Sequence, residues 1–301
     1  MIRLLRGRPT AVPLLGDALG PRGKRRVRVA SFVAGVAVAA IVGWMIKGLM
    51  DAGQFAGRLW EPFTDSNVLD FLWVGLLNTA KAAALAMVLA MVLGALLALA
   101  RLTDNRLVRW PAVAFIEFFR GIPLILLIFF IAIGLPKYGL GLPPLWALVL
   151  GLVAYNGAVL AEIFRAGILS LDRGQSEAAF AIGLGYWPAM RLVIIPQAAR
   201  RMVPAIVSQL VTLLKDTSLG FVIPYEELLR RSDQTGKYYG NILQALVVAA
   251  LIYIAVNYCL SHVAKRLEHR QRRRLGASGI RVAGAAEDLA VLSAQAQNHN
   301  T

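Results

Sequence analysis

The chain has 301 residues, 58% of them hydrophobic, and its mean hydropathy is +0.62. Soluble domains use about 45–50% apolar residues, so this composition excludes a water-soluble globular protein and indicates a membrane-embedded one. The net charge is +15. The basic residues lie beside the apolar stretches, where anionic lipid headgroups account for them, so nucleic acid is not an expected partner.

Six stretches are apolar over about 20 residues, the length needed to cross a bilayer. The sequence therefore predicts an all-α, polytopic membrane protein with a basic tail at 1–28 and a second tail at 263–301. This second tail is basic at first and then has the composition of a disordered segment. The predicted spans are at about 29–50, 70–100, 111–136, 144–168, 193–223 and 238–262.

Arg and Lys are unevenly distributed among the connecting segments, and basic segments stay in the cytoplasm. Segments 101–110 and 165–201 are rich in Arg, whereas segment 51–70 carries several acidic residues and a lone Arg58. We therefore expect both termini on the cytoplasmic side of the cell membrane. The mixed loop at 224–237 is placed outside because the alternation of spans requires it.

Charged residues inside spans are costly and mark candidate functional positions. Glu117 and Arg120 are three residues apart in the third predicted span, and Glu162 and Arg165 repeat this spacing in the fourth. Each pair therefore shares a helix face. For Glu117 and Arg120, pairing and snorkelling to the interface explain the pattern equally well. For Glu162 and Arg165, a structural ion pair is favoured over a gate.

Lys215 and Asp216 interrupt the fifth predicted span and are followed by Thr217 and Ser218. Neighbouring opposite charges would be expensive against lipid, so a role in a translocation pathway or between helices is favoured. Lys81, inside the second predicted span, either lines the same pathway or pairs within the bundle.

Four prolines are predicted to break or bend spans, because proline removes a backbone donor from the helix. Irregular backbone at membrane depth is tolerated where it is buried or lines a cavity. The fifth span contains two of the four, which makes it a candidate for the element that rearranges. The four are Pro123, Pro196, Pro204 and Pro224.

The sequence contains neither a phosphate-binding loop of the Gly-x4-Gly-Lys type nor a set of metal ligands at a recognisable spacing. ATP binding, a cofactor or a metal site in this chain, and enzymatic catalysis, are therefore not expected. The single cysteine, Cys259, lies in the last predicted span and is interpreted as a packing residue.

The segment between the fourth and fifth spans carries the most informative motif. Residues 173–186 have helix-forming residues ahead of Gly185, which predicts a short helix outside the lipid. Small residues would let another protein approach its backbone closely, and its glutamate could pair with a basic partner. Alone, Glu-Ala-Ala would indicate a solvated loop helix, but the whole spacing favours docking. The motif consists of Glu177, Ala178, Ala179, Gly183 and, after aliphatic residues, Pro196.

This spacing resembles the EAA loop of ABC importer permeases, and residues 70–262 resemble the permease subunits of polar amino acid importers. Val193 and Ile195 depart conservatively from the aliphatic residues usual in the loop, and the span at 29–50 is additional to the core of that family. The resemblance rests on Asn78-Thr79, Glu117 to Pro123, Glu162 to Ile168, Gly174 to Ala179, Pro196-Gln197 and Lys215 to Leu219.

The resemblance implies a five-span core that forms half of a dimeric pathway, with the loop 173–196 docked on a cytoplasmic ATPase that binds the ATP. It also implies a second permease subunit, identical or different, and an extracytoplasmic solute-binding protein. The long basic amino terminus resembles that of actinobacterial glutamate permeases, which makes glutamate the first substrate to test. Two alternatives stay open, a permease for another small solute and a stand-alone secondary transporter. An inverted repeat would favour the second alternative, and the sequence shows none.

Overall fold

The structure is a computed structural model that describes residues 20–262 and residue 266. Most of the two predicted tails therefore lies outside the described residues. Within the described ranges every regular element is a helix, which confirms the predicted all-α class. The chain divides into two units, Met1–Gly57 and Arg58–Thr301, and each is described by itself.

The first unit contains the helix α1, Pro21–Asp51. It includes the predicted span 29–50 but begins earlier, because Pro21 provides a favourable first turn and the basic residues after it are good helix formers. None of its residues is buried. The segment 21–28, expected to be part of a tail, is therefore helical.

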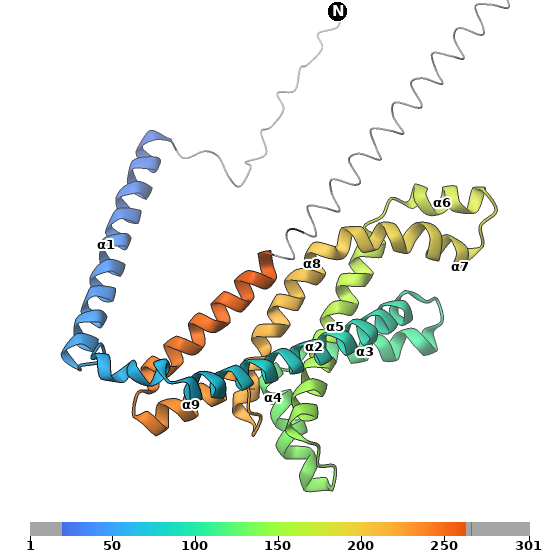
Figure 1. Ribbon diagram of the computed structural model, residues 1–301. Helices are drawn as coiled ribbons and strands as arrows, with labels where there is room; N and C mark the ends of the chain where they lie inside the picture. The colour runs from blue at the N-terminus through green and yellow to red at the C-terminus, as the bar shows by residue number, and fades with distance from the viewer. Residues whose placement is uncertain (1–19, 263–265, 267–301) are drawn as a thin grey trace, which may run out of the picture. The chain divides into compact units, whose positions relative to one another are not determined.

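The helices α2, Ser66–Leu102, and α5, Pro144–Leu169, form the central pair of the second unit (Figure 1). Asp65 caps α2 by accepting a hydrogen bond of 2.8 Å from the backbone N–H of Asn67. Small buried residues recur every fourth position along α2, which lets another helix approach closely. They are Ala82, Ala86, Ala90, Gly94 and Ala98.

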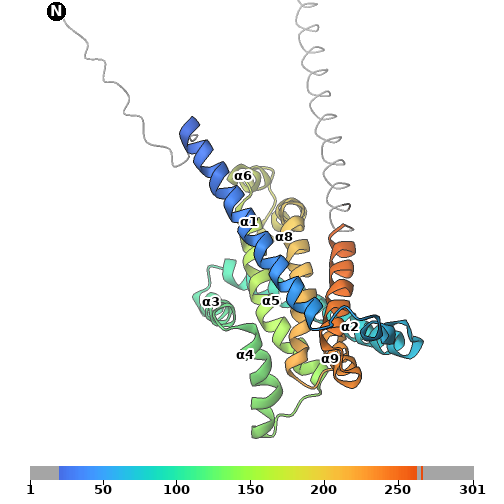
Figure 2. The ribbon, with the colours of Figure 1, turned by 90° about the vertical axis from the view of Figure 1, so that its left-hand side faces the viewer.

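The predicted third span, 111–136, is not one straight helix. The helix α3, Arg106–Gly121, ends at a 102° bend, after which helical structure runs over Leu124–Tyr138 as α4 (Leu124–Phe129), η3 (Phe130–Gly134) and η4 (Leu135–Tyr138). Pro123 causes the break, because the residue before a proline avoids the α conformation and Ile122 is extended. The expected effect of Pro123 on the third span is confirmed (Figure 2).

The next long helix runs over Tyr186–Val222 and begins earlier than the predicted 193. Pro196 lies in the first turn of α8, where its missing N–H is not needed, and the helix continues past Pro204. A break at either of these two prolines is therefore not found, although the ribbon of this helix changes direction along its length (Figure 1), and Pro224 does follow the end of the helix. Its segments are α7 (Tyr186–Ala189), the π-helix η5 (Met190–Ile194), α8 (Ile195–Asp216) and the 3-10 helix η6 (Thr217–Val222).

The loop expected at 224–237 is largely helical. It forms α9, Leu228–Tyr239, which packs against α2, and Gly240 connects α9 to the last described helix, Ile242–His262. Ahead of α2 are two short 3-10 helices, η1 (Gly57–Leu59) and η2 (Glu61–Thr64), and the second unit also contains the short helix α6, Arg173–Ala181.

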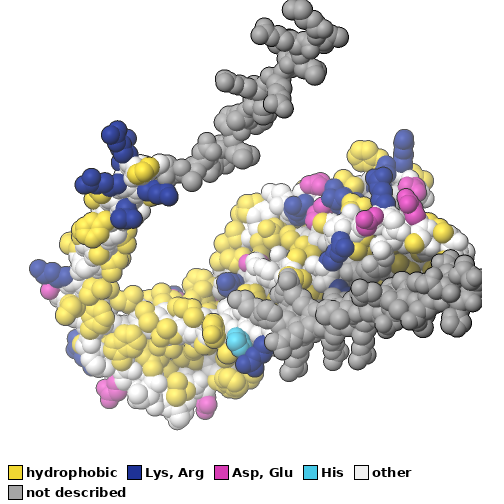
Figure 3. All heavy atoms as spheres, turned by 90° about the horizontal axis from the view of Figure 1, so that it is seen from above, with side chains coloured by type: hydrophobic (Ala, Val, Ile, Leu, Met, Phe, Trp, Pro, Cys, Tyr) yellow, Lys and Arg dark blue, Asp and Glu magenta, His cyan; other side chains and the backbone are white. Residues whose placement is uncertain are grey.

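Five described helices are long and apolar enough to cross a membrane, and the bent pair makes six spans if it is counted as one. The outer surface agrees with this, because apolar side chains cover much of its visible face (Figure 3). The end of the bundle that carries α6 instead shows a mixture of basic and acidic side chains. The protein is thus a polytopic, all-α membrane protein.

Candidate functional site

The helix α6 carries the predicted docking motif. Asp172 starts it by accepting a hydrogen bond of 2.8 Å from the backbone N–H of Gly174. The helix ends at Ala181, and Gly183 has a φ of +85°, a conformation that glycine adopts without steric cost. The expected stop at Gly185 is wrong, because Gly183 already turns the chain and Gly185 caps α7.

The motif residues divide into exposed and buried ones. Glu177, Ala178 and Gly183 are exposed, but Ala179 is only 3% exposed. Ala179 is the buried residue of α6, which packs against α7 and η5, so the expectation that it faces a partner is wrong. Pro196 is half-buried, one residue before Gln197.

A hydrogen bond ties α6 to the long helix that follows it. Gln197 Nε2 donates to Gln175 Oε1 at 3.0 Å. Three large apolar residues in and after α6 are exposed, namely Phe180 (48%), Ile182 (77%) and Trp187 (69%). Their exposure in a segment outside the spans marks an interaction surface, a signal that the sequence analysis did not use.

A network of ion pairs joins α2, α3 and α5. Arg101 Nη1 lies 3.2 Å from Glu117 Oε1 and 2.5 Å from Glu162 Oε1. Glu162 Oε2 also lies 3.1 Å from Arg165 Nη2, so the predicted pairing of Glu162 with Arg165 is found. The predicted pairing of Glu117 with Arg120 is not found, because Glu117 reaches Arg101 instead. Arg120 is exposed and has no ion pair within the described part of the chain.

The charges at the end of α8 do not form a pair. Successive residues of a helix point about 100° apart. Lys215 is exposed and Asp216 is half-buried, and no ion pair joins the two within the described residues. The predicted role of Lys215 and Asp216 in a pathway or between helices stays a prediction.

The polar residues next to these charges make local contacts. Thr217 is buried and donates to Leu214 O at 2.6 Å, and Ser218 donates to Lys215 O at 2.7 Å. Lys81, on α2, is exposed and has no ion pair within residues 20–262.

A polar contact between α5 and α8 was missed from the sequence. Asn156 is fully buried, and its Oδ1 accepts a hydrogen bond of 2.7 Å from Gln209 Nε2. These two residues form a polar contact between α5 and α8 inside the bundle. Such contacts inside membrane proteins are found between helices or along a water-filled path.

A second network fixes α9 to the rest of the unit. Glu227 is fully buried, and its carboxylate accepts hydrogen bonds from the backbone N–H groups of Leu229 (2.8 Å) and Arg230 (2.6 Å) and from the Tyr253 hydroxyl (2.7 Å). Burial raises the pKa of the Glu227 carboxyl above its ordinary value. The side chain therefore acts as an internal cap for α9.

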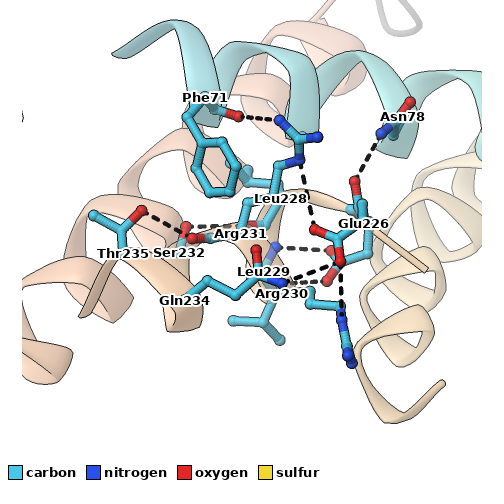
Figure 4. A network of polar contacts seen from close by, with 12 residues as sticks. Phe71, Asn78, Glu226, Leu228, Leu229, Arg230, Arg231, Ser232, Gln234 and Thr235 are labelled. Atoms are coloured by element: carbon cyan, nitrogen blue, oxygen red, sulfur yellow. Dashed lines mark hydrogen bonds and ion pairs between the residues drawn. The ribbon is translucent and has the colours of Figure 1, made fainter. Parts of the chain in front are cut away.

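The same network reaches α2 (Figure 4). Asn78 Nδ2 donates to Glu226 O at 2.8 Å, and the Leu228 N–H donates to Thr79 Oγ1 at 3.1 Å. Arg231 donates to Phe71 O at 3.0 Å and lies over the Phe71 ring. Asn78 and Thr79, quoted above for the family resemblance, thus contact the start of α9 and the segment just before it.

Tyr225 completes the contact, since its hydroxyl donates to Asn78 O at 2.8 Å. Burial, together with the nearby Glu227 charge, raises the pKa of Tyr225 to about 12. This phenol therefore stays protonated and keeps its donor at every physiological pH.

Residues 90–273 match the family model described as "Binding-protein-dependent transport system inner membrane component". The chain belongs to this family. It is an amino acid ABC importer permease, and such subunits are not enzymes.

The relatives of this permease have names that describe amino acid transport. The glutamate transport system permease protein GluD of Corynebacterium glutamicum is 39% identical over 225 residues, which are 73% of this chain and 82% of the relative. The probable glutamine ABC transporter permease protein GlnP of Bacillus subtilis is 40% identical over 209 residues, 67% of this chain and 94% of the relative.

A solved structure shares the fold of the permease. A chain of an amino acid ABC transporter crystallised with histidines has a TM-score of 0.65 and 31% identity, and the match covers 67% of this chain and 94% of that one. The permease fold predicted from the sequence is confirmed by this match and by the family model.

Proposed function

We propose that this permease forms half of the membrane pathway of an importer for glutamate or a closely related polar amino acid, driven by a separate cytoplasmic ATPase. The observation that carries the proposal is α6, a short capped helix that presents Glu177 and Ala178 to solvent at one end of the bundle. ATP belongs to the partner, and no cofactor is assigned to this chain.

The contacts of α6 suit a coupling role. It packs against η5 and α7 and bonds through Gln175 to Gln197, so a displacement of α6 acts directly on the helix Tyr186–Val222. That helix also carries Lys215 and Gln209, and Gln209 donates a hydrogen bond to Asn156 of α5. Coupling through a contiguous, stiff element is a physical route for transmitting ATPase closure.

Two arguments support glutamate among the polar amino acids. The relative GluD is named for glutamate, and the glutamate/aspartate import permease GltK of Escherichia coli is 33% identical over 219 residues. Glutamine and another polar amino acid are the alternatives, since GlnP is equally similar. The proposed partners are an extracytoplasmic solute-binding protein and a second permease subunit, identical or different.

The remaining charged positions keep their proposed roles near the pathway. Glu117, Glu162 and Arg165 form a tie with Arg101 at the ends of three helices, so we assign them to holding these helices together and to gating. Arg120 and Lys81 are exposed and unpaired in the described residues, which leaves them available to a second subunit or to the pathway.

The function is tested by reconstituting the permease with its ATPase, its binding protein and any second permease subunit. The importer is oriented with its ATPase facing the lumen of proteoliposomes that contain ATP. We expect ATP-dependent uptake of labelled L-glutamate into this lumen. Unlabelled glutamate should compete better than glutamine, and an organic cation such as putrescine should not compete. Uptake of a sugar or a metal ion in place of every amino acid would contradict the proposal.

We propose that both termini and α6 are cytoplasmic, as the Arg and Lys asymmetry indicates. In a Cys259→Ser background, Ser66→Cys should react with an impermeant thiol reagent in intact cells, and Ala181→Cys should react only after permeabilisation. Both positions are exposed, so access to the surface does not limit either reaction. The reverse labelling pattern would overturn the orientation.

A further inference from the structure

A hollow of about 700 Å³ runs along one face of α1, and its lining has a basic part and an apolar part. The basic part consists of Arg22, Arg25 and Arg26, near the start of the helix. The apolar part follows directly along the helix and contains only aliphatic side chains. These are Val29, Ala30, Val33, Ala34 and Ala37.

The spacing of the lining residues places them on one side of α1. Residues three or four positions apart share a face of an α-helix, and the lining keeps to this spacing throughout. Arg22 and Arg26 are four positions apart on this face. Lys24 and Arg28 are also four positions apart, but they fall on the opposite face, because each residue advances about 100° around the helix axis.

The three arginines that line the hollow lack counter-ions in their own helix. All three are exposed, and none has an ion pair within residues 20–262. The helix contains no acidic residue before Asp51, which lies at the other end of its 31 residues. Because like charges so close together repel one another, an anion that binds between the guanidinium groups stabilises this end of α1.

The two parts of the hollow determine the kind of anion that fits. Guanidinium groups bind phosphate oxygens through paired, charge-assisted hydrogen bonds. The aliphatic part of the lining belongs to a helix that is long and apolar enough to cross the hydrocarbon of a membrane. A ligand that fills both parts therefore has a phosphate at one end and a hydrocarbon chain at the other.

We propose that this face of α1 is a binding site for an anionic phospholipid. The phosphate lies between Arg22, Arg25 and Arg26, and one acyl chain lies along the aliphatic residues from Val29 to Ala37. Basic side chains gather at this end of the helix, at the upper left of Figure 3. A zwitterionic headgroup fits less well, because its ammonium group meets three positive charges. The site uses residues of α1 alone and does not depend on which amino acid is carried.

The test measures lipid binding to the full-length permease by native mass spectrometry. The protein is delipidated in a mild non-ionic detergent and titrated with phosphatidylglycerol or with phosphatidylethanolamine of the same acyl chains. We expect phosphatidylglycerol to occupy one site per chain. Phosphatidylethanolamine should bind at least about fivefold more weakly, the contribution of a single basic residue to binding an anionic lipid.

The double variant Arg22→Gln with Arg26→Gln should lower the affinity for phosphatidylglycerol about thirtyfold, since each basic residue contributes about fivefold. Lys24→Gln with Arg28→Gln is the matched control, because it removes two charges at the same spacing from the opposite face. The control should stay within about twofold of the parent, since charges across a helix about 10 Å wide are largely screened at about 0.15 M salt. Both variants lose the same number of positive charges, so an effect on membrane insertion would be common to both.

A second pair of variants tests the acyl chain while it leaves every charge in place. Ala34→Trp fills the aliphatic part of the hollow, whereas Ala39→Trp adds the same side chain at an exposed position outside the lining. We expect Ala34→Trp to lower the affinity about tenfold, the effect of displacing about two methylene groups from an apolar contact. Ala39→Trp should bind the lipid like the parent protein.

An equal loss of affinity in the two double variants would overturn the proposal, because it would indicate a general attraction of anionic lipid to basic residues. Equal binding of the two lipids would also overturn it. Full competition by glycerol 3-phosphate at the concentration of the lipid would show that the acyl chain is not bound. Lipid binding that is lost in the assembled importer would show that a partner subunit covers this face of α1, which contradicts the proposal as well.

Discussion

A permease that carries Glu177→Arg will insert and fold normally but will lose its ATPase. Glu177 is exposed on α6 and has no ion pair within the described residues, so the substitution leaves the fold intact. A surface of the ATPase that pairs with the Glu177 carboxylate is positively charged. The arginine would place a second positive charge against it, which costs several kcal/mol at an interface. We expect the affinity for the ATPase to fall at least about a hundredfold, the equivalent of about 2.7 kcal/mol.

Co-purification of the ATPase with the tagged permease, followed by uptake, measures this loss. Glu61→Arg is the matched control, because Glu61 is also exposed and undergoes the same change of charge in η2, outside α6. The control should retain the ATPase. Full retention of the ATPase by Glu177→Arg would rule out α6 as the docking helix.

Gly94→Val will prevent stable packing of the central helices. A Cβ at this position would lie 2.8 Å from Leu160 Cβ and 3.0 Å from Gly157 O, and the helix backbone of α5 cannot move aside cheaply. Overpacking typically costs about 1–3 kcal/mol, and the two further methyl groups of valine place this variant at or above the upper end.

The yield of monodisperse protein in detergent and its melting temperature give the readout. Ala95→Val is the control, since Ala95 is the adjacent residue of α2 and is exposed. We expect the control to match the parent protein and Gly94→Val to yield little folded material. Equal melting temperatures for the two variants would show that α2 and α5 do not need this close contact.

The spans could be predicted because membrane insertion requires only length and apolarity, which are local properties. The bend at Pro123 could be predicted for the same reason, since proline restricts the conformation of the residue directly before it. Pro196 and Pro204 show the limit of the same rule. A first-turn position makes the missing N–H of Pro196 harmless, whereas Pro204 lies inside α8 and the helix still continues, so the effect of a proline is not fixed by its presence in a span alone.

The candidate site was predicted where it depends on spacing and missed where it depends on tertiary contact. Glu162 and Arg165 are one helical turn apart, so their pairing was visible. Arg101 meets Glu162 across 61 positions, a pairing that no local pattern reveals. The burial of Glu227 could not be predicted either, because the mixed charges of the surrounding sequence are typical of a solvent-exposed loop. Only the packing of α9 on α2 shows that this segment is partly buried.

The π-helix η5 determines how the part of the long helix before it is rotated about the helix axis relative to the part after it. An α-helix advances about 100° per residue, so the extra residue of a π-turn rotates everything beyond it by about that angle. On one side of η5 lies α7, which packs with α6; on the other lies α8, which packs with α5. The helical register at Met190–Ile194 therefore determines the direction in which α7, and α6 packed on it, face relative to α8 and α5.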